Sequence, residues 1–212
     1  MGAVHLVRHG EVENPDGVIY GRLPGFGLSA EGREQAARTA AYLARQVDGA
    51  PRVVASPLLR AEQTARILME PLGVDELAID ERLTEAMSGL EGLPRRFTVR
   101  GFARRFLDPG RRKEAERPGA VARRVAAAVR ELRAETDAHR DLVIVSHQFP
   151  IAVGRVALER GVTEREGPRL VRAAPWLFMR GRCGLASVTT LRFDASGRAT
   201  RTYWEPGRDP AR

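Results

Sequence analysis

The chain has 212 residues, and its 35 arginine and lysine side chains against 27 acidic ones give a formal net charge of +8. This length suits one globular domain with a substantial core, and no apolar run approaches the roughly 20 residues that span a bilayer. The N-terminus lacks a basic region followed by a long apolar stretch, which excludes a secretory signal. We therefore expect a cytoplasmic protein that does not engage a membrane.

Cys183 is the only cysteine, which excludes an intramolecular disulfide and a cysteine metal cluster. It opens a strand-like segment, residues 183–193, where a small apolar side chain suits a buried position better than a reactive thiol does. We interpret Cys183 as structural.

The positive charge is concentrated in residues 94–117, which hold nine basic and three acidic side chains. The chain has no zinc-finger spacing, RNP-type aromatic motif or helix-turn-helix signal, so nucleic acid is disfavoured as a partner. We favour a solvated face or a lid for anionic substrates. The charge also hints at an acidic substrate, such as a sugar phosphate or a phosphorylated acid.

The first predicted strand, residues 4–7, runs into Arg8-His9-Gly10-Glu11 and then a Gly/Pro-rich loop over 14–27. Ser29 is a typical N-cap residue and predicts a helix that reaches about Gln46. A second apolar run, residues 52–55, leads into Ser56 and Pro57. These two residues predict an N-cap and a first-turn proline for a helix that carries Arg60 and ends near Glu70.

The second half of the chain repeats this order of elements. A short strand, residues 77–79, precedes Glu85, and Gly, Pro and Arg clusters over 86–118 indicate an inserted lid that sets specificity. The later elements are a helix over about 119–138, a strand over 142–146, a helix from near Pro150, and a terminal hairpin of 183–193 and 200–204 with its turn at 194–197.

Alternating strands and helices predict an α/β fold. We expect residues 1–212 to form a single-domain three-layer α/β/α sandwich with a mostly parallel central sheet. In such a sheet the carboxyl ends of the strands face one crevice. Arg8, His9, Arg60, Glu85 and His147 would therefore meet there, although they lie far apart in the sequence.

These residue types suit phosphoryl transfer without a metal. A neutral imidazole is a competent nucleophile towards phosphorus, Gly10 would leave room for a substrate beside it, and arginine presents planar donors to phosphate oxygens. His147 could bind the transferring group as a cation. One carboxylate with a raised pKa could protonate the leaving alkoxide and then activate water; Glu85 is the first candidate, and Glu91 and Glu11 are rivals.

Four motifs, in this order and spacing, resemble the histidine phosphatase superfamily, in particular its phosphoglycerate mutase-like branch. They are Leu6-Val7-Arg8-His9-Gly10-Glu11, Ser56-Pro57-Leu58-Leu59-Arg60-Ala61-Glu62-Gln63-Thr64-Ala65, Leu83-Thr84-Glu85 with Gly89 and Glu91-Gly92, and Val145-Ser146-His147.

The resemblance implies His9 as the nucleophile and Glu85 as the proton donor. It implies a phosphate pocket of Arg8, Arg60 and His147, with Asn14 as a further polar residue that lines it. No metal and no cofactor are implied. The two remaining histidines, His5 and His139, we interpret as structural.

Departures from the family's mutases weaken a mutase interpretation. Val12-Glu13-Asn14-Pro15 replaces their serine and Trp-Asn, and Ala86-Met87-Ser88 follows the acid where they have basic and aromatic residues. Gln148-Phe149 follows His147 where glycines are usual, so that it narrows the pocket or adds an amide contact to the substrate.

We therefore expect a metal-independent, acid-phosphatase-like phosphomonoesterase that hydrolyses a small-molecule phosphate monoester through a phosphohistidine. The alternatives are a cofactor-dependent phosphoglycerate mutase, a protein phosphohistidine phosphatase, and a non-catalytic basic protein that binds nucleic acid or an acidic partner through residues 94–117. The sequence does not set the oligomeric state.

Overall fold

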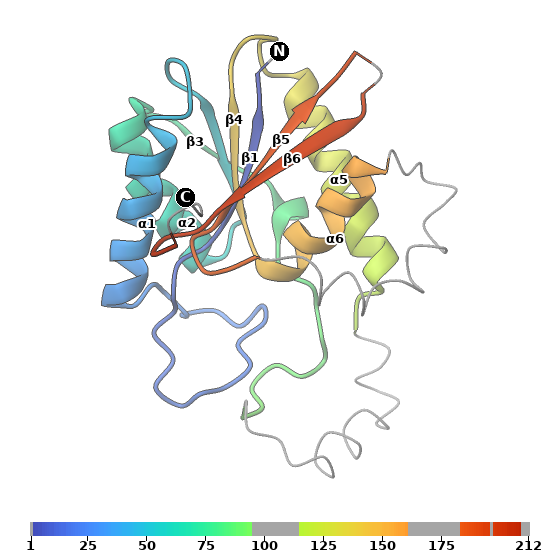
Figure 1. Cartoon of the computed structure of the whole chain (residues 1–212). Coiled ribbons are helices and arrows are strands. Elements are labelled where there is room, and N and C mark those ends of the chain that lie inside the picture. Colours follow the sequence, from blue (N-terminus) through green and yellow to red (C-terminus); the bar gives the residue numbers. More distant parts are fainter. Residues whose placement is uncertain (1, 95–114, 161–182, 196, 209–212) are drawn as a thin grey trace.

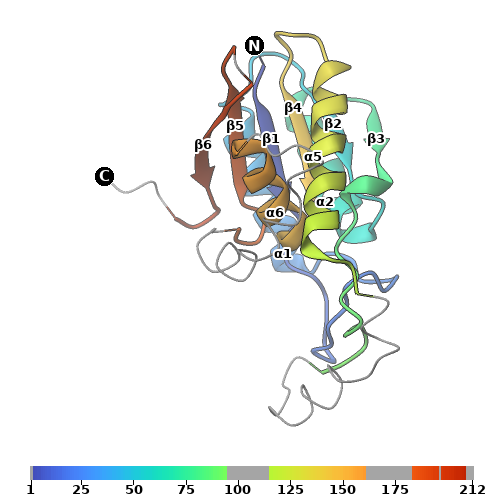
Figure 2. The same ribbon diagram turned by 90° about the vertical axis from the view of Figure 1, so that its right-hand side faces the viewer.

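A computed structural model of the chain describes residues 2–94, 115–160, 183–195 and 197–208. A six-stranded sheet lies between two helical layers, with α5 and α6 on one face and α1 and α2 on the other (Figures 1 and 2). The strands are β1 Val4–Arg8, β2 Arg52–Ala55, β3 Leu77–Ile79, β4 Leu142–Ser146, β5 Val188–Phe193 and β6 Ala199–Trp204. The helices are α1 Ala30–Leu43, α2 Leu59–Met69, α5 Pro118–Ala134 and α6 Gln148–Glu159, with short 3₁₀ turns η1 Glu70–Leu72 and η2 Glu81–Leu83.

The order of strands across the sheet is β3-β2-β4-β1-β5-β6. The first four run parallel, and β5 and β6 close the sheet as an antiparallel hairpin beside β1. The central parallel strands β4 and β2 are mostly apolar and buried, as is usual where helices cover both faces of a sheet. The predicted α/β fold with its mostly parallel sheet is confirmed.

The core has one hydrophobic cluster on each face of the sheet. Leu6 packs with α5 and α6, whereas the next residue, Val7, packs with α1 and α2. This alternation is the two-residue period of a strand, and it anchors the end of β1 from both sides. Within the described residues no helix is both long enough and apolar enough to cross a bilayer.

The helix boundaries correct several predictions. Ser29 is confirmed as the N-cap of α1, since its hydroxyl oxygen accepts from Gly32 N at 3.0 Å. α1 ends at Leu43 rather than Gln46, because the chain tightens there and Gln46 N donates to Leu43 O at 2.8 Å. The predicted cap at Ser56 and Pro57 is wrong: α2 begins at Leu59, with Leu58 as an N-cap without a side-chain hydrogen bond.

Two later boundaries also differ. α5 ends at Ala134 and not at Ala138. Just after this end, the Thr136 hydroxyl donates to Leu132 O at 2.7 Å. α6 begins at Gln148 and not near Pro150. A proline is tolerated in the first turn of a helix, because the N–H groups of that turn have no partner within the helix.

The C-terminal hairpin is confirmed, but β5 begins at Val188, so that Cys183 lies before the strand. Cys183 is buried, as expected, and burial raises the pKa of its thiol to about 11. The predicted lid over 86–118 stays a prediction, because residues 95–114 lie outside the described residues.

Close packing against α1 requires a glycine at position 10, which the sequence did not indicate. A Cβ atom on Gly10 would collide with the carbonyl of Gly32 in the first turn of α1. The backbone N–H of Gly10 donates to Thr64 Oγ1 at 3.2 Å, and its carbonyl accepts from His9 Nδ1 at 2.7 Å. Gly10 therefore fixes the position of α1 and the orientation of the His9 ring together.

Replacement of Gly10 by alanine should lower the free energy of unfolding by about 1–3 kcal/mol, because the methyl group overpacks this contact. Chemical denaturation measures the change. Ala37→Ser, at an exposed position of the same helix, should stay within about 0.5 kcal/mol of the wild type. Equal stability of Gly10→Ala and wild type would show that α1 is not held this closely.

Candidate active site

Two histidines meet at the carboxyl edge of the sheet. β1 and β4 are parallel and pair in a register that places Arg8 beside Ser146. The residue after each strand is a histidine, and the ring centroids of His9 and His147 are 5.2 Å apart. Both side chains are fully buried. The predicted convergence of these two residues is therefore present in the structure.

The ring of His9 has a defined proton arrangement. Its Nδ1 lies 2.7 Å from the carbonyl oxygen of Gly10, which can only accept, so Nδ1 carries the proton. Burial lowers the pKa of His9 well below its ordinary value, and the charges of Arg60 and Arg8 lower it further. The neutral ring is left with its lone pair on Nε2, which is the form that a nucleophile needs.

His147 is oriented by Ser56. The Ser56 hydroxyl oxygen accepts from Leu58 N at 3.4 Å and lies 2.7 Å from His147 Nε2. Because Nε2 is the acceptor within reach of the hydroxyl proton, Ser56 donates to His147. The ring then carries its own proton on Nδ1, which is buried and has no hydrogen-bond partner among the described residues. Burial lowers the pKa of His147 well below its ordinary value, and the closeness of His9, Arg60 and Arg8 lowers it further. In the protein without a bound ligand, His147 is therefore better described as a neutral hydrogen-bond donor than as the predicted cation.

Two arginines supply the positive charge. Arg60, in the first turn of α2, is fully buried, and its guanidinium carbon lies 4.7 Å from the centroid of the Tyr20 ring. One of its terminal nitrogens donates to Gly21 O at 2.7 Å. Arg8 donates in the same way to Cys183 O, also at 2.7 Å.

Each arginine keeps a buried Nε without a hydrogen-bond partner in the described part of the chain. A buried donor without an acceptor carries a desolvation penalty, and an anion between the two guanidinium groups would remove it. The first turn of a helix adds the favourable dipole and free N–H groups that anions prefer. Arg8 and Arg60 lie close enough to His9 and His147 to lower the pKa of both rings, so the free donors of these side chains are candidates for binding a phosphate beside His9.

Glu85 lies in the loop that follows β3 and η2, and it shares a cavity with His9. A cavity of about 420 Å³ is lined by Arg8, His9 and Glu85, among others. Burial raises the pKa of the Glu85 carboxyl against the opposing effects of an Ala86 N–H bond and of both arginines. This environment favours the protonated carboxyl that a general acid requires.

The rival carboxylates have other partners. Glu91 accepts from the backbone and hydroxyl of Ser88 at 2.9 and 3.0 Å, and the exposed Glu11 accepts from the Ser29 hydroxyl at 2.9 Å. Glu116 also lines the cavity, but it is paired with Arg22 and Arg124, which hold its pKa below the ordinary value. Of the described carboxylates, Glu85 is the one that combines access to His9 with a raised pKa.

The two remaining candidates from the sequence, Asn14 and Gln148, line different cavities. Asn14 closes its own loop, donating to Val18 O at 2.9 Å and accepting from Val18 N at 3.1 Å. It lines a separate cavity of about 370 Å³, to which Arg8 also contributes. Gln148, at the start of α6, lines the cavity of His9.

Sequence reasoning missed part of the apolar wall of the site, namely Ile19 and Tyr20. Ile19, Tyr20, Met87 and Phe149 line the cavity beside His9. Tyr20 also holds its ring 6.4 Å from that of His9. The signal for Tyr20 was weak, since it is one of two aromatic residues in a Gly/Pro-rich loop. Its role depends on Arg60, which is forty residues further along the chain.

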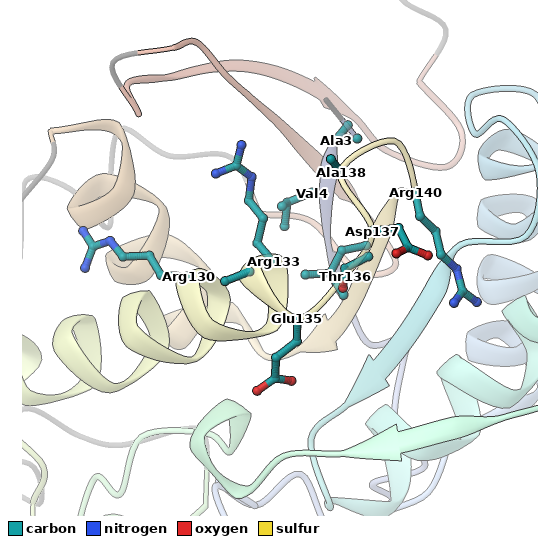
Figure 3. A pocket seen from close by; sticks show the side chains of 12 residues that line it. Ala3, Val4, Arg130, Arg133, Glu135, Thr136, Asp137, Ala138 and Arg140 are labelled. Atoms are coloured by element: carbon teal, nitrogen blue, oxygen red, sulfur yellow. The ribbon is translucent and has the colours of Figure 1, made fainter.

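A second hollow, of about 440 Å³, lies at the opposite, amino edge of β1 and β4. Figure 3 shows that Arg130, Arg133 and Arg140 point in different directions there. The guanidinium of Arg140 bonds to the carbonyls of Ala50 and Pro51. These arginines do not converge on one anion. Nor do the described residues contain a group of three or more His, Cys, Asp or Glu side chains arranged to hold a metal ion.

A parallel α/β sheet whose carboxyl edge collects two histidines and two arginines defines a class of phosphate-handling enzyme. The chain belongs to the histidine phosphatase superfamily (branch 1), whose family model matches residues 4–205. The resemblance found in the four sequence motifs is thereby confirmed.

Relatives and solved structures agree with this assignment. An uncharacterized protein of Mycobacterium tuberculosis is 38% identical over 214 residues, covering 96% of each chain. A probable phosphoglycerate mutase of an Enterobacter species is 42% identical over 91 residues, covering 42% of this chain and 40% of the mutase. A mycobacterial glucosyl-3-phosphoglycerate phosphatase, solved with VO₃, is 27% identical with a TM-score of 0.71, covering 97% of this chain and 99% of the other. The family and the solved phosphatase support a phosphatase.

Proposed function

We propose that the protein hydrolyses a small-molecule phosphate monoester, without a metal, through a phosphohistidine on Nε2 of His9. The observation that carries this proposal is the proton arrangement of the site. Nδ1 of His9 is committed to Gly10 O, which leaves Nε2 free to attack. The unpaired donors Arg8 Nε, Arg60 Nε and His147 Nδ1 belong to the side chains around it.

In the first step Nε2 of His9 attacks phosphorus, and the bond from phosphorus to the alcohol oxygen breaks. Glu85 gives its proton to that oxygen, so the alcohol leaves neutral. In the second step Glu85, now a carboxylate, takes a proton from a water molecule that attacks the phosphohistidine. Inorganic phosphate and free His9 result. Arg8, Arg60 and His147 stabilise the charge on the three phosphoryl oxygens in both transition states.

The described cavity wall favours hydrolysis over the mutase reaction. A phosphoglycerate mutase must also hold the carboxylate of its substrate, which calls for a free cation near the acid. The described lining of this cavity includes the apolar Ile19, Met87 and Phe149. Besides the proposed catalytic residues Arg8, His9 and Glu85, its one charged side chain among the described residues is the acidic Glu116. The partial identity with a probable phosphoglycerate mutase keeps that reaction as the alternative.

The test is a phosphomonoester panel assayed with EDTA present. It includes 3-phosphoglycerate with and without 2,3-bisphosphoglycerate, glycerol phosphate, and an aryl phosphate. We expect phosphate release that survives EDTA, with higher kcat/KM for esters of uncharged, partly apolar alcohols than for 3-phosphoglycerate. Isomerisation of 3-phosphoglycerate without phosphate release would instead establish the mutase. Affinity for nucleic acid that falls steeply with salt, without any turnover, would favour the binding protein.

A further inference from the structure

A cluster of three charged side chains lies behind Glu85. Glu116, two residues before α5, accepts from Arg124 Nε at 2.7 Å with one oxygen. Its other oxygen accepts from Arg124 at 2.9 Å and from Arg22 at 2.8 Å. The three side chains are each one fifth to one third exposed. We call Arg22, Glu116 and Arg124 the acid clamp.

Both arginines of the acid clamp also reach the main chain of Glu85. Arg22 Nε donates to the carbonyl oxygen of Glu85 at 2.5 Å, and Arg124 donates to the same oxygen at 3.5 Å. A second nitrogen of Arg124 donates to Arg82 O at 2.6 Å. The loop before α1, the loop after η2 and helix α5 thus meet at the backbone of one residue, and Glu116 ties the two arginines together.

The orientation of the Glu85 carboxyl group depends on this backbone. Its Oε1 accepts from the N–H of the following residue, Ala86, at 2.8 Å. A side chain that is bonded to its own backbone turns with that backbone. A displacement of the loop would therefore carry the carboxyl group away from the leaving oxygen, and a shift of about 1 Å can cost 10²-fold in rate.

We propose that Arg22, Glu116 and Arg124 are positioning residues that hold Glu85 at the leaving-group oxygen of the substrate. The inference rests on the proposed function, since it assumes that Glu85 is the general acid. Glu116 offsets the charge of one of the two arginines, so that the acid clamp holds the loop with a single net positive charge.

The test compares two leaving groups in Arg124→Met. An alkyl alcohol needs a proton in order to leave, whereas p-nitrophenolate leaves readily as an anion. The ratio kcat/KM reports the steps up to phosphohistidine formation and excludes its hydrolysis. We expect kcat/KM for glycerol phosphate to fall about 10²-fold, and that for p-nitrophenyl phosphate to change less than about threefold. Equal losses on both substrates, or no loss on either, would overturn the proposal.

Arg82→Met is the matched control. The Arg82 side chain also joins the Glu85 loop to α5, through Asp80 and Glu131, but it does not contact Glu85. It should change both substrates equally and little. If Arg124→Met does not fold, Arg22→Met removes the shorter of the two bonds to Glu85 O and leaves α5 intact; it should show the same selective loss.

Glu85→Gln separates the two proposals. If this variant shows no selective loss on glycerol phosphate, Glu85 is not the acid and the proposed function itself fails at that residue. If Glu85→Gln is selective while Arg124→Met and Arg22→Met are not, only the positioning role is wrong.

Discussion

His9→Ala should lose turnover of every phosphomonoester, by about 10⁴-fold or more, because no other group at the site can accept the phosphoryl group. The His147 ring is held through Ser56, and its free nitrogen carries a proton and not a lone pair. Steady-state phosphate release, measured with EDTA present, gives the loss. Binding of inorganic phosphate should survive, since Arg8 and Arg60 remain.

The same variant tests the covalent intermediate. Wild-type protein quenched during turnover should carry an acid-labile phosphoryl group on Nε2 of His9, and His9→Ala should carry none. His139→Ala is the matched control, because this histidine is exposed in the turn before β4; it should keep both turnover and labelling. A label on His147, or substantial turnover by His9→Ala, would contradict the assignment.

The burial of this site explains why its groups are poised before any substrate arrives. His9, His147 and Arg60 are almost inaccessible to water. Among the described residues, Arg60 Nε and His147 Nδ1 have no hydrogen-bond partner. Such an arrangement lowers stability in the free protein, and a bound phosphate would remove much of that cost. Stabilisation follows the logarithm of ligand concentration over Kd, so phosphate or vanadate should raise the Tm of the wild type.

Much of the site could be predicted because parallel strands constrain it. Continuous apolar runs marked β1, β2 and β4, and the rule that their carboxyl ends share one crevice placed His9, Arg60 and His147 together. The acid was harder to choose, since Glu85, Glu91 and Glu11 look alike in sequence. Burial and competing partners distinguish them, and both depend on the fold.

Interactions between distant segments could not be predicted. Ser56 looked like an N-cap, because the sequence cannot show that His147 would lie 2.7 Å from its hydroxyl. The sequence suggested that Gly10 leaves space for a substrate, but it could not show that Gly10 packs against the backbone of Gly32. The acid clamp joins residues about one hundred positions apart, and within an arginine-rich chain neither Arg22 nor Arg124 stands out.

Glu85→Gln should lower kcat/KM for an alkyl phosphate by about 10²–10⁴-fold, the usual contribution of a general acid. The wild type should also show a pH dependence that the variant lacks. The first step needs protonated Glu85, so its rate falls as the pH rises through the pKa of Glu85. Burial raises that pKa, which extends activity towards neutral pH.

The acid side of the profile belongs to His9, which must be neutral in order to attack. Its pKa is lowered, so the nucleophile persists at a lower pH than an exposed histidine would allow. The two shifts therefore widen the active range from opposite ends. The second ionisation of the substrate is common to both proteins, and it cancels in the ratio of wild-type to Glu85→Gln activity at each pH.

That ratio should be large at acid pH and fall towards higher pH with glycerol phosphate, and stay nearly flat with p-nitrophenyl phosphate. Glu91→Gln, which alters the rival carboxylate bonded to Ser88, should reproduce the wild-type profile on both substrates. A flat ratio for glycerol phosphate, or a selective loss in Glu91→Gln, would move the acid away from Glu85. The leaving-group contrast thus identifies the proton donor independently of any effect on binding, because all these variants retain Arg8, Arg60 and His147, which we propose to bind the phosphoryl group.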